Sequence, residues 1–153
     1  MRAYFWTNFM LSSIQHGIQA QHCTAEMFVK YSNHNAKESN SFKDMILHNW
    51  AKNHKTTIIK NAGALADLNR IVNLFAEAAA FEHHDLPWAF FREDQESLGS
   101  IITCVGIIVP EKVYNHVPNY MSGNLANSDN GEYILTPFEY KLFDLIDKTS
   151  LAR

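Results

Sequence analysis

The chain of 153 residues has little net charge of either sign and only two cysteines. Thirteen Lys and Arg against sixteen Asp and Glu give a net charge of −3 with histidine neutral, which argues against a strongly basic protein that coats nucleic acid but allows a local basic patch. No apolar run is long enough to span a bilayer, so we expect no membrane association. The first residues lack the apolar core and cleavage site of a secretory signal. Cys23 and Cys104 form no CxxC motif, and we expect two free thiols in a reducing, cytoplasmic environment.

Several catalytic and binding motifs are also missing. There is no G-x-S-x-G nucleophile elbow, and the single Gly63 before a predicted helix is not a phosphate-binding fingerprint. His83, His84 and Asp85 can suggest a metal site. Adjacent histidines at a helix end more often cap carbonyls or face solvent, so we expect no metal. We expect no other cofactor, and no internal repeat divides the chain.

What the sequence does contain is an alternation of apolar, strand-like runs with amphipathic helical segments. Strands are predicted near residues 2–9, 56–60, 86–92 and 100–109. Helices are predicted from about 13 to 31, from Ser41 past Trp50, and from Leu65 to near His83. The pattern predicts an α/β fold, a three-layer sandwich around a four-stranded mixed sheet, with residues 100–109 as a central strand.

The end of the chain has a different character. Residues 115–133 are rich in Asn, Ser, Gly and Pro and are predicted to form a long excursion. Thr136, Pro137 and Glu139 then supply an N-cap, a first-turn proline and a capping-box acid, which predict a C-terminal helix. We therefore expect an α/β domain over residues 1–114 and a loop with a helical extension over 115–153. That helix docks on the same domain or on a second copy of the chain, as in a homodimer.

The first helix carries a polar face. Its apolar residues near one face are Ile14, Ile18, Ala25 and Phe28, and we expect Ile14, Ile18 and Phe28 to be buried. The neighbouring polar face holds Gln15, Gln19, His22 and Glu26. A strand that delivers a helix N-terminus with amide and imidazole groups is a typical place for an anion or polar ligand. We expect Gln15, Gln19 and His22 to line a cleft, and the alternative is a solvated helix face.

A single basic cluster lies between residues 48 and 60, where two histidines and three lysines surround Trp50. Lys55 and its neighbours can bind phosphate while Trp50 stacks on a base. The alternative, which we favour, is a solvated helix end with Trp50 in the core.

The order strand, helix, helix, strand, helix, strand, strand resembles that of the peptidyl-tRNA hydrolase 2 family. Gly17 to Ala25, GIQAQHCTA, is similar to the family's Gly-Lys step and Ala-Ala-Gln-x-x-His-Ala run. Leu86 to Glu93, LPWAFFRE, resembles its leucine-proline … arginine-aspartate strand, and Leu98 to Gly106, LGSIITCVG, its Gly-Thr-rich entry to the last strand. The match covers residues 2–113 and rests on order and spacing more than on identity.

The resemblance implies cleavage of the ester between a peptide and tRNA, with tRNA or another RNA as partner. The family's lysine falls on Gly17 or Ile18 here, and its aspartate aligns with Glu93. Its threonine aligns best with Ser100, or with Gly99 after a one-residue slip. His16 or His22 then replaces the lysine as base or oxyanion donor. The predicted catalytic residues are His16, His22, Glu93 and Ser100, and the predicted substrate contacts are Gln15, Gln19, Asp94 and Lys55. The alternative is a non-catalytic binding or assembly protein of the same fold, favoured by the missing lysine.

Overall fold

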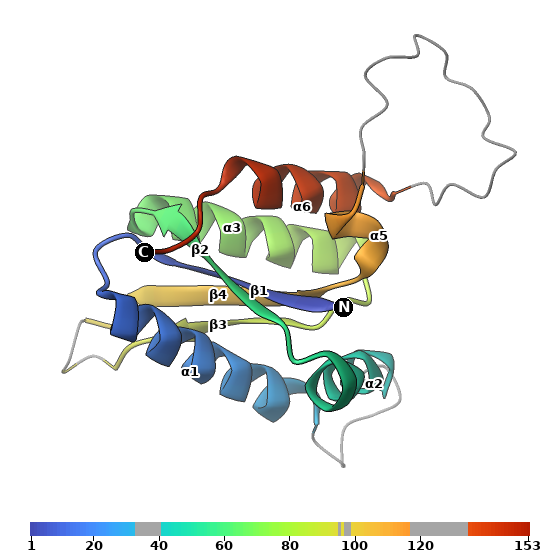
Figure 1. Ribbon diagram of the computed structural model, residues 1–153, viewed down its shortest axis with the longest axis horizontal. Helices are drawn as coiled ribbons and strands as arrows, with labels where there is room; N and C mark the ends of the chain where they lie inside the picture. Colours follow the sequence, from blue (N-terminus) through green and yellow to red (C-terminus); the bar gives the residue numbers. More distant parts are fainter. Residues whose placement is uncertain (33–40, 95, 97–98, 117–134) are drawn as a thin grey trace, which may run out of the picture.

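The computed structural model describes residues 1–32, 41–94, 96, 99–116 and 135–153, and it forms a four-stranded mixed sheet with helices on both faces (Figure 1). The strands are β1 Arg2–Asn8, β2 Thr57–Gly63, β3 Trp88–Arg92 and β4 Ile102–Val109. Their order is β2-β1-β4-β3, with β1 and β2 parallel and the other two pairs antiparallel. The α/β class and the mixed sheet are thereby confirmed. One difference is that β2 continues to Gly63, beyond the strand predicted near residues 56–60.

Two central strands carry the core. Every side chain of β4 is buried, as its continuous apolar run predicts. In β1 alternate side chains face opposite helix layers, so that Tyr4 and Trp6 enter one apolar core and Phe5 enters the other. Gly106 of β4 pairs with Phe5, and a Cβ atom at Gly106 would collide with the Phe5 ring. The missing side chain at Gly106 therefore makes room for that ring between the sheet and α1.

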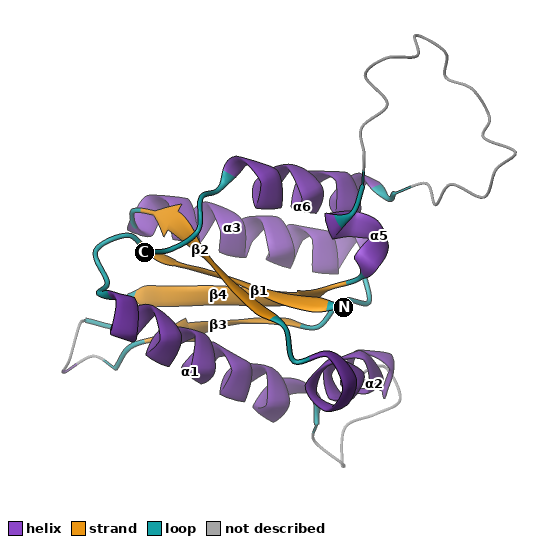
Figure 2. Cartoon of the chain, in the orientation of Figure 1, coloured by secondary structure: helices purple, strands orange, loops and turns teal. Residues whose placement is uncertain are grey.

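The helices form two layers that enclose the sheet, as Figure 2 shows. α1 and α2 cover one face, and α3 and α6 cover the other (Figure 1). The helices are α1 Ser13–Tyr31, α2 Ser41–Asn49, α3 Leu65–Glu77, α5 Glu111–Tyr114 and α6 Pro137–Lys148, and α2 and α3 each run into a π-helical turn, η2 Trp50–His54 and η3 Ala78–Glu82. None of the helices in the described ranges combines the length and apolar character needed to cross a membrane.

The C-terminal segment packs on the domain at two places. Phe138 and Leu142 of α6 are fully buried in the same core as Trp6 and α3. Beyond α6, the amide of Asn61 donates to the carbonyl of Ser150 (2.8 Å), and that of Ala152 donates to Ile59 (3.0 Å), so the chain end covers the outer edge of β2. From residue 117 on, the predicted excursion over 115–133 lies outside the described residues.

The buried face of α1 is not the predicted one. Ile14 and Ile18 are 77% and 45% exposed, so their predicted burial is wrong, and Phe28 is half-buried. The residues that α1 buries are His16, Gln19, Ala20, Cys23, Met27 and Tyr31. The physical reason is that the sheet beneath α1 supplies hydrogen-bond partners for His16 and Gln19, which an apolar count along one helix does not register.

Both cysteines are free, as predicted, and both are buried. The thiol of Cys23 donates to the carbonyl of Ala89 (3.2 Å). Burial, and then the neighbouring Cys23, raises the pKa of Cys104 well above its usual range. Both groups thus behave as small apolar core residues.

Candidate functional site

Buried polar side chains gather under the first half of α1. Among the described residues five polar side chains are buried, and four of them, Thr7, His16, Gln19 and Thr103, belong to α1 and the two central strands. Thr7 lies near the end of β1 and Thr103 near the start of β4, and these ends are adjacent because Thr7 pairs with Cys104. Polar groups concentrated at one end of an otherwise apolar sheet form the candidate site.

Gln19 links α1 to the end of β3 through a hydrogen-bonded relay. Its side-chain amide donates to the carboxylate of Glu93 (2.6 Å), and its carbonyl accepts from the hydroxyl of Thr103 (2.7 Å). An ionised carboxylate only accepts, so Gln19 presents its NH2 group to Glu93 and Thr103 must donate. The relay therefore fixes the orientation of both the Gln19 amide and the Glu93 carboxylate.

Glu93 follows β3 directly and remains half-buried. Its backbone amide donates to the carbonyl of Ile101 (3.0 Å), which extends the pairing of β3 with the start of β4. The carboxylate is thus anchored from both ends, by the backbone and by Gln19, yet it keeps access to solvent. This combination suits a group that acts as a base or binds a polar ligand.

His16 is buried, with 4% of its surface exposed, and its Nδ1 atom hydrogen bonds with the hydroxyl of Thr7 at 2.7 Å. Burial lowers the pKa of this imidazole below its ordinary 6.5. His16 is therefore neutral at pH 7 and does not supply the fixed positive charge that a lysine would.

His22 lies about one turn beyond Gln19 on α1 and is exposed. Its ring stacks on Phe91 of β3, with centroids 4.5 Å apart and planes inclined by 14°. Phe91 and Glu93 both contact α1, Phe91 through His22 and Glu93 through Gln19. The exposed imidazole and the half-buried carboxylate thus belong to one surface of α1 and β3.

Gln15 closes the N-terminus of α1. Its side-chain carbonyl accepts from the amide of Ser12 (2.9 Å), while its own amide donates to the Ser12 hydroxyl (3.4 Å). In this capping box the backbone N–H groups of Ser12 and Gln15 are satisfied by the protein's own side chains. Gln15 is exposed, and its contacts are those of a helix cap.

Ser100 and Asp94 belong to the turn between β3 and β4. Ser100 has a φ of +61°, its amide donates to the carbonyl of Asp94 (3.3 Å), and its carbonyl accepts from the guanidinium of Arg92 (2.8 Å). Asp94 and Arg92 are exposed. The turn places a fixed cation, Arg92, next to Glu93 in sequence.

Lys55 does not join the other predicted site residues. It ends η2 just before β2, and because β1 and β2 run parallel, it lies at the end of the sheet opposite Gln19 and Glu93. Nearby Trp50 is buried and donates through its indole N–H to the carbonyl of Thr56 (3.0 Å). The alternative interpretation of the basic cluster, with Trp50 in the core, is the one observed.

Thr7 and Thr103 are members of the site that sequence reasoning missed. A signal was present, because each hydroxyl interrupts an apolar strand, Thr7 in YFWTNF and Thr103 in SIITCVGIIV. A hydroxyl on a central strand must find a buried partner, and a polar face on the next helix is the natural one.

The site offers a carboxylate, an amide, an imidazole and a nearby guanidinium. In the part of the chain that the structure describes, no three His, Cys, Asp or Glu side chains are grouped to hold a metal ion. Compared with protein-family models and with curated proteins, the chain matches none of them.

Proposed function

We propose that this protein is a peptidyl-tRNA hydrolase-like ester hydrolase whose site is the Gln19–Glu93 surface. The observation that carries the proposal is the 2.6 Å contact between Gln19 and Glu93. Two of the three stretches whose sequences resemble the peptidyl-tRNA hydrolase 2 family contain these two residues. The strand and helix order on which that resemblance rests also supports it.

Hydrolysis of an ester by water needs a base for the water and a donor for the developing oxyanion. Glu93 is the base in this proposal, because it is anchored and open to solvent. His22 is the donor or acid, since its imidazole is exposed on the same surface. His16, held by Thr7 and neutral, supports the start of α1 instead of reacting. Because water is the attacking group, this mechanism needs no tyrosine, serine or cysteine nucleophile.

The substrate in this proposal is the 3′ end of a tRNA that carries a peptidyl or N-blocked aminoacyl ester. Arg92 is exposed and donates to the carbonyl of Ser100, but its guanidinium lies over the ring of Phe90 and not on the Gln19–Glu93 side of β3, so a terminal phosphate would meet it around the end of the strand. One such contact gives weak affinity and a shallow salt dependence, which fits the net charge of −3.

A second candidate is binding of the same ligand without cleavage. The specific observation in its favour is that His16 is buried and neutral, so the lysine of the family has no charged counterpart on this part of α1. A site without that charge can still recognise the ligand through Glu93 and Arg92.

Steady-state hydrolysis of N-acetylphenylalanyl-tRNA, compared between variants, tests the proposal. Glu93→Gln removes the base, so we expect kcat to fall by about a hundredfold to ten-thousandfold. Glu26→Gln is the matched control, because Glu26 is an exposed carboxylate on α1, and it should leave kcat unchanged. Binding by the parent protein without any hydrolysis would select the second candidate. Hydrolysis that survives Glu93→Gln at full rate would refute the role of this site.

A further inference from the structure

A hollow lies at the opposite end of the sheet from the Gln19–Glu93 surface. It is a groove of about 830 Å³ where β4 ends, β3 begins, and the first residues of α2 and α6 approach each other. Pro110, which follows β4 directly, lines the groove. At roughly 3.4 Å per residue along the strand, it lies about 24 Å from Thr103. The groove is therefore separate from the candidate hydrolytic site.

The walls of the groove are largely apolar and include two aromatic rings. The apolar lining residues are Phe42, Ile46, Leu86, Pro110, Pro137 and Phe138. Phe42 of α2 is 50% exposed, so a large apolar ring stands uncovered at this site. A volume of this size and an apolar lining with few polar groups are typical of small-molecule sites.

His84 contributes an uncharged ring to the wall. It stacks on Phe138 with centroids 4.3 Å apart, and its Nδ1 atom accepts the amide N–H of Leu86 (3.2 Å). Burial lowers the pKa of His84 to about 4, and the backbone of Phe75 only partly offsets this effect. The imidazole is consequently neutral at pH 7 and adds no positive charge to the groove.

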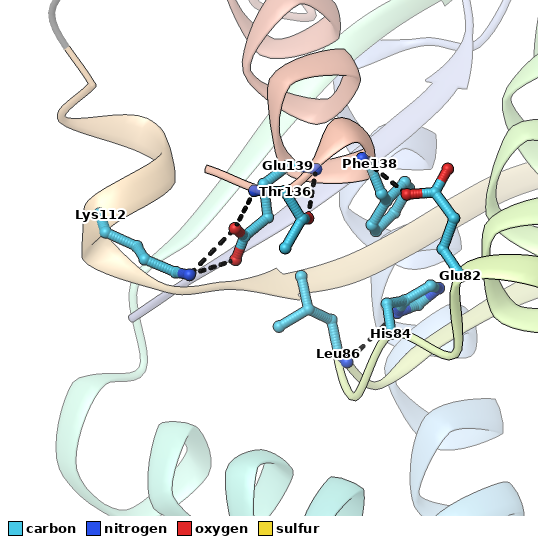
Figure 3. Close-up of polar contacts among 7 residues, drawn as sticks. All are labelled: Glu82, His84, Leu86, Lys112, Thr136, Phe138 and Glu139. Atoms are coloured by element: carbon cyan, nitrogen blue, oxygen red, sulfur yellow. Dashed lines mark hydrogen bonds and ion pairs between the residues drawn. The ribbon is translucent and has the colours of Figure 1, made fainter. Parts of the chain in front are cut away.

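Two ammonium groups at the groove are each paired with a carboxylate. Figure 3 shows the Lys112 ammonium against the Glu139 carboxylate, whose two oxygens lie 2.7 and 2.9 Å from it. The carboxylate of Glu82 accepts the amide N–H of Phe138 (2.9 Å) and pairs with Lys141 (3.5 Å). Each cation is thus matched by a carboxylate.

The N-terminus of α6 is likewise occupied by the protein's own groups. The amide of Thr136 donates to the Glu139 carboxylate (2.9 Å), and the amide of Glu139 donates to the Thr136 hydroxyl (3.2 Å). Together with the Phe138–Glu82 bond, these contacts use the N–H groups that would otherwise attract a phosphate. A phosphorylated or otherwise anionic ligand would have to displace them.

We propose that this groove binds an uncharged, mainly apolar small molecule with a flat ring, which packs against Phe42 and the wall formed by His84 and Phe138. Lys112 is already paired with Glu139, so the gain on binding comes from the open apolar wall as it loses contact with water. Binding at this place is independent of hydrolysis at Glu93.

N-Phenyl-1-naphthylamine, an uncharged fluorophore that brightens in apolar surroundings, is a suitable probe. Titrated into the full chain, it should bind saturably with one site per chain. Phe42→Ala should weaken that binding by about tenfold, because most of one ring contact is lost. The anionic probe 1-anilinonaphthalene-8-sulfonate should bind at least about tenfold more weakly than the uncharged one, because Lys112, the one lysine or arginine among the described lining residues, is already paired with Glu139.

The matched control is Phe81→Ala, which removes a phenylalanine that is 81% exposed and does not line the groove. Its affinity for the uncharged probe should equal that of the parent protein. Circular dichroism checks that both variants fold, and Ile46→Trp, which fills part of the groove, should also weaken binding. The proposal is overturned if the probe does not saturate, if Phe81→Ala weakens binding as much as Phe42→Ala, or if the anionic probe binds equally well.

Discussion

Replacing Thr103 by valine removes one hydroxyl and almost nothing else from the relay under α1. Valine has nearly the same shape as threonine, so the packing of β4 is kept while the Gln19 carbonyl loses its donor. Thr103 is fully buried and Gln19 nearly so, which means that water cannot replace the lost bond without opening the core. A buried acceptor left without a partner costs about 1–3 kcal/mol. We therefore expect Thr103→Val to lower the free energy of unfolding by about that amount.

Urea denaturation followed by circular dichroism measures this loss, and thermal unfolding should show a drop of about 2–4 °C per kcal/mol for a domain of this size. The control is Thr103→Ser, which keeps the hydroxyl and removes a buried methyl group worth about 0.8 kcal/mol. If the valine variant is as stable as the parent while the serine variant is not, Thr103 contributes packing only, and the relay to Glu93 has no energetic role.

Gly106→Ala should destabilise the fold by about 1–3 kcal/mol in urea denaturation, because its Cβ would collide with Phe5, and an unchanged midpoint would contradict the close approach. The stability of the parent should fall as pH drops from about 6.5 toward 4, since unfolded His84 binds a proton that the folded ring, with a pKa of about 4, does not. His84→Phe should flatten that slope by less than the full 1.4 kcal/mol per pH unit, because the ring is only partly buried, and an identical slope in parent and variant would refute the assignment. Cys23 and Cys104 should react with a thiol reagent only in denaturant, and fast labelling of the native protein would show that they are not core residues.

Signals confined to one segment predicted its structure well. The apolar run before Val109 indicated a central strand, and Thr136 with Glu139 indicated the start of α6, where both capping-box hydrogen bonds are present. Each of these features depends on neighbours within a few residues, which the sequence displays directly.

Contacts between residues that lie far apart in the sequence could not be predicted from local patterns. On α1 the sequence favoured Ile14 as a buried residue, yet the chain buries His16 and Gln19, whose partners Thr7 and Thr103 lie on β1 and β4. The pairing of the C-terminal residues with β2 has no local pattern either. Gln19, His22 and Glu93 were nevertheless predicted as site residues. The family resemblance suggested Glu93, and the spacing along α1 suggested the other two.

The central claim, that the Gln19–Glu93 surface is where a tRNA 3′ end is bound, is tested most directly by nuclear magnetic resonance. A 15N-labelled sample is titrated with an uncleavable analogue, adenosine carrying an N-acetylaminoacyl amide in place of the 3′ ester. We expect saturable shifts of the Gln19 side-chain amide and the Glu93 backbone amide, with the indole N–H of Trp50 at the opposite end unchanged. Shifts confined to the end near Trp50, or no shift at Gln19 and Glu93 at saturating analogue, would contradict it.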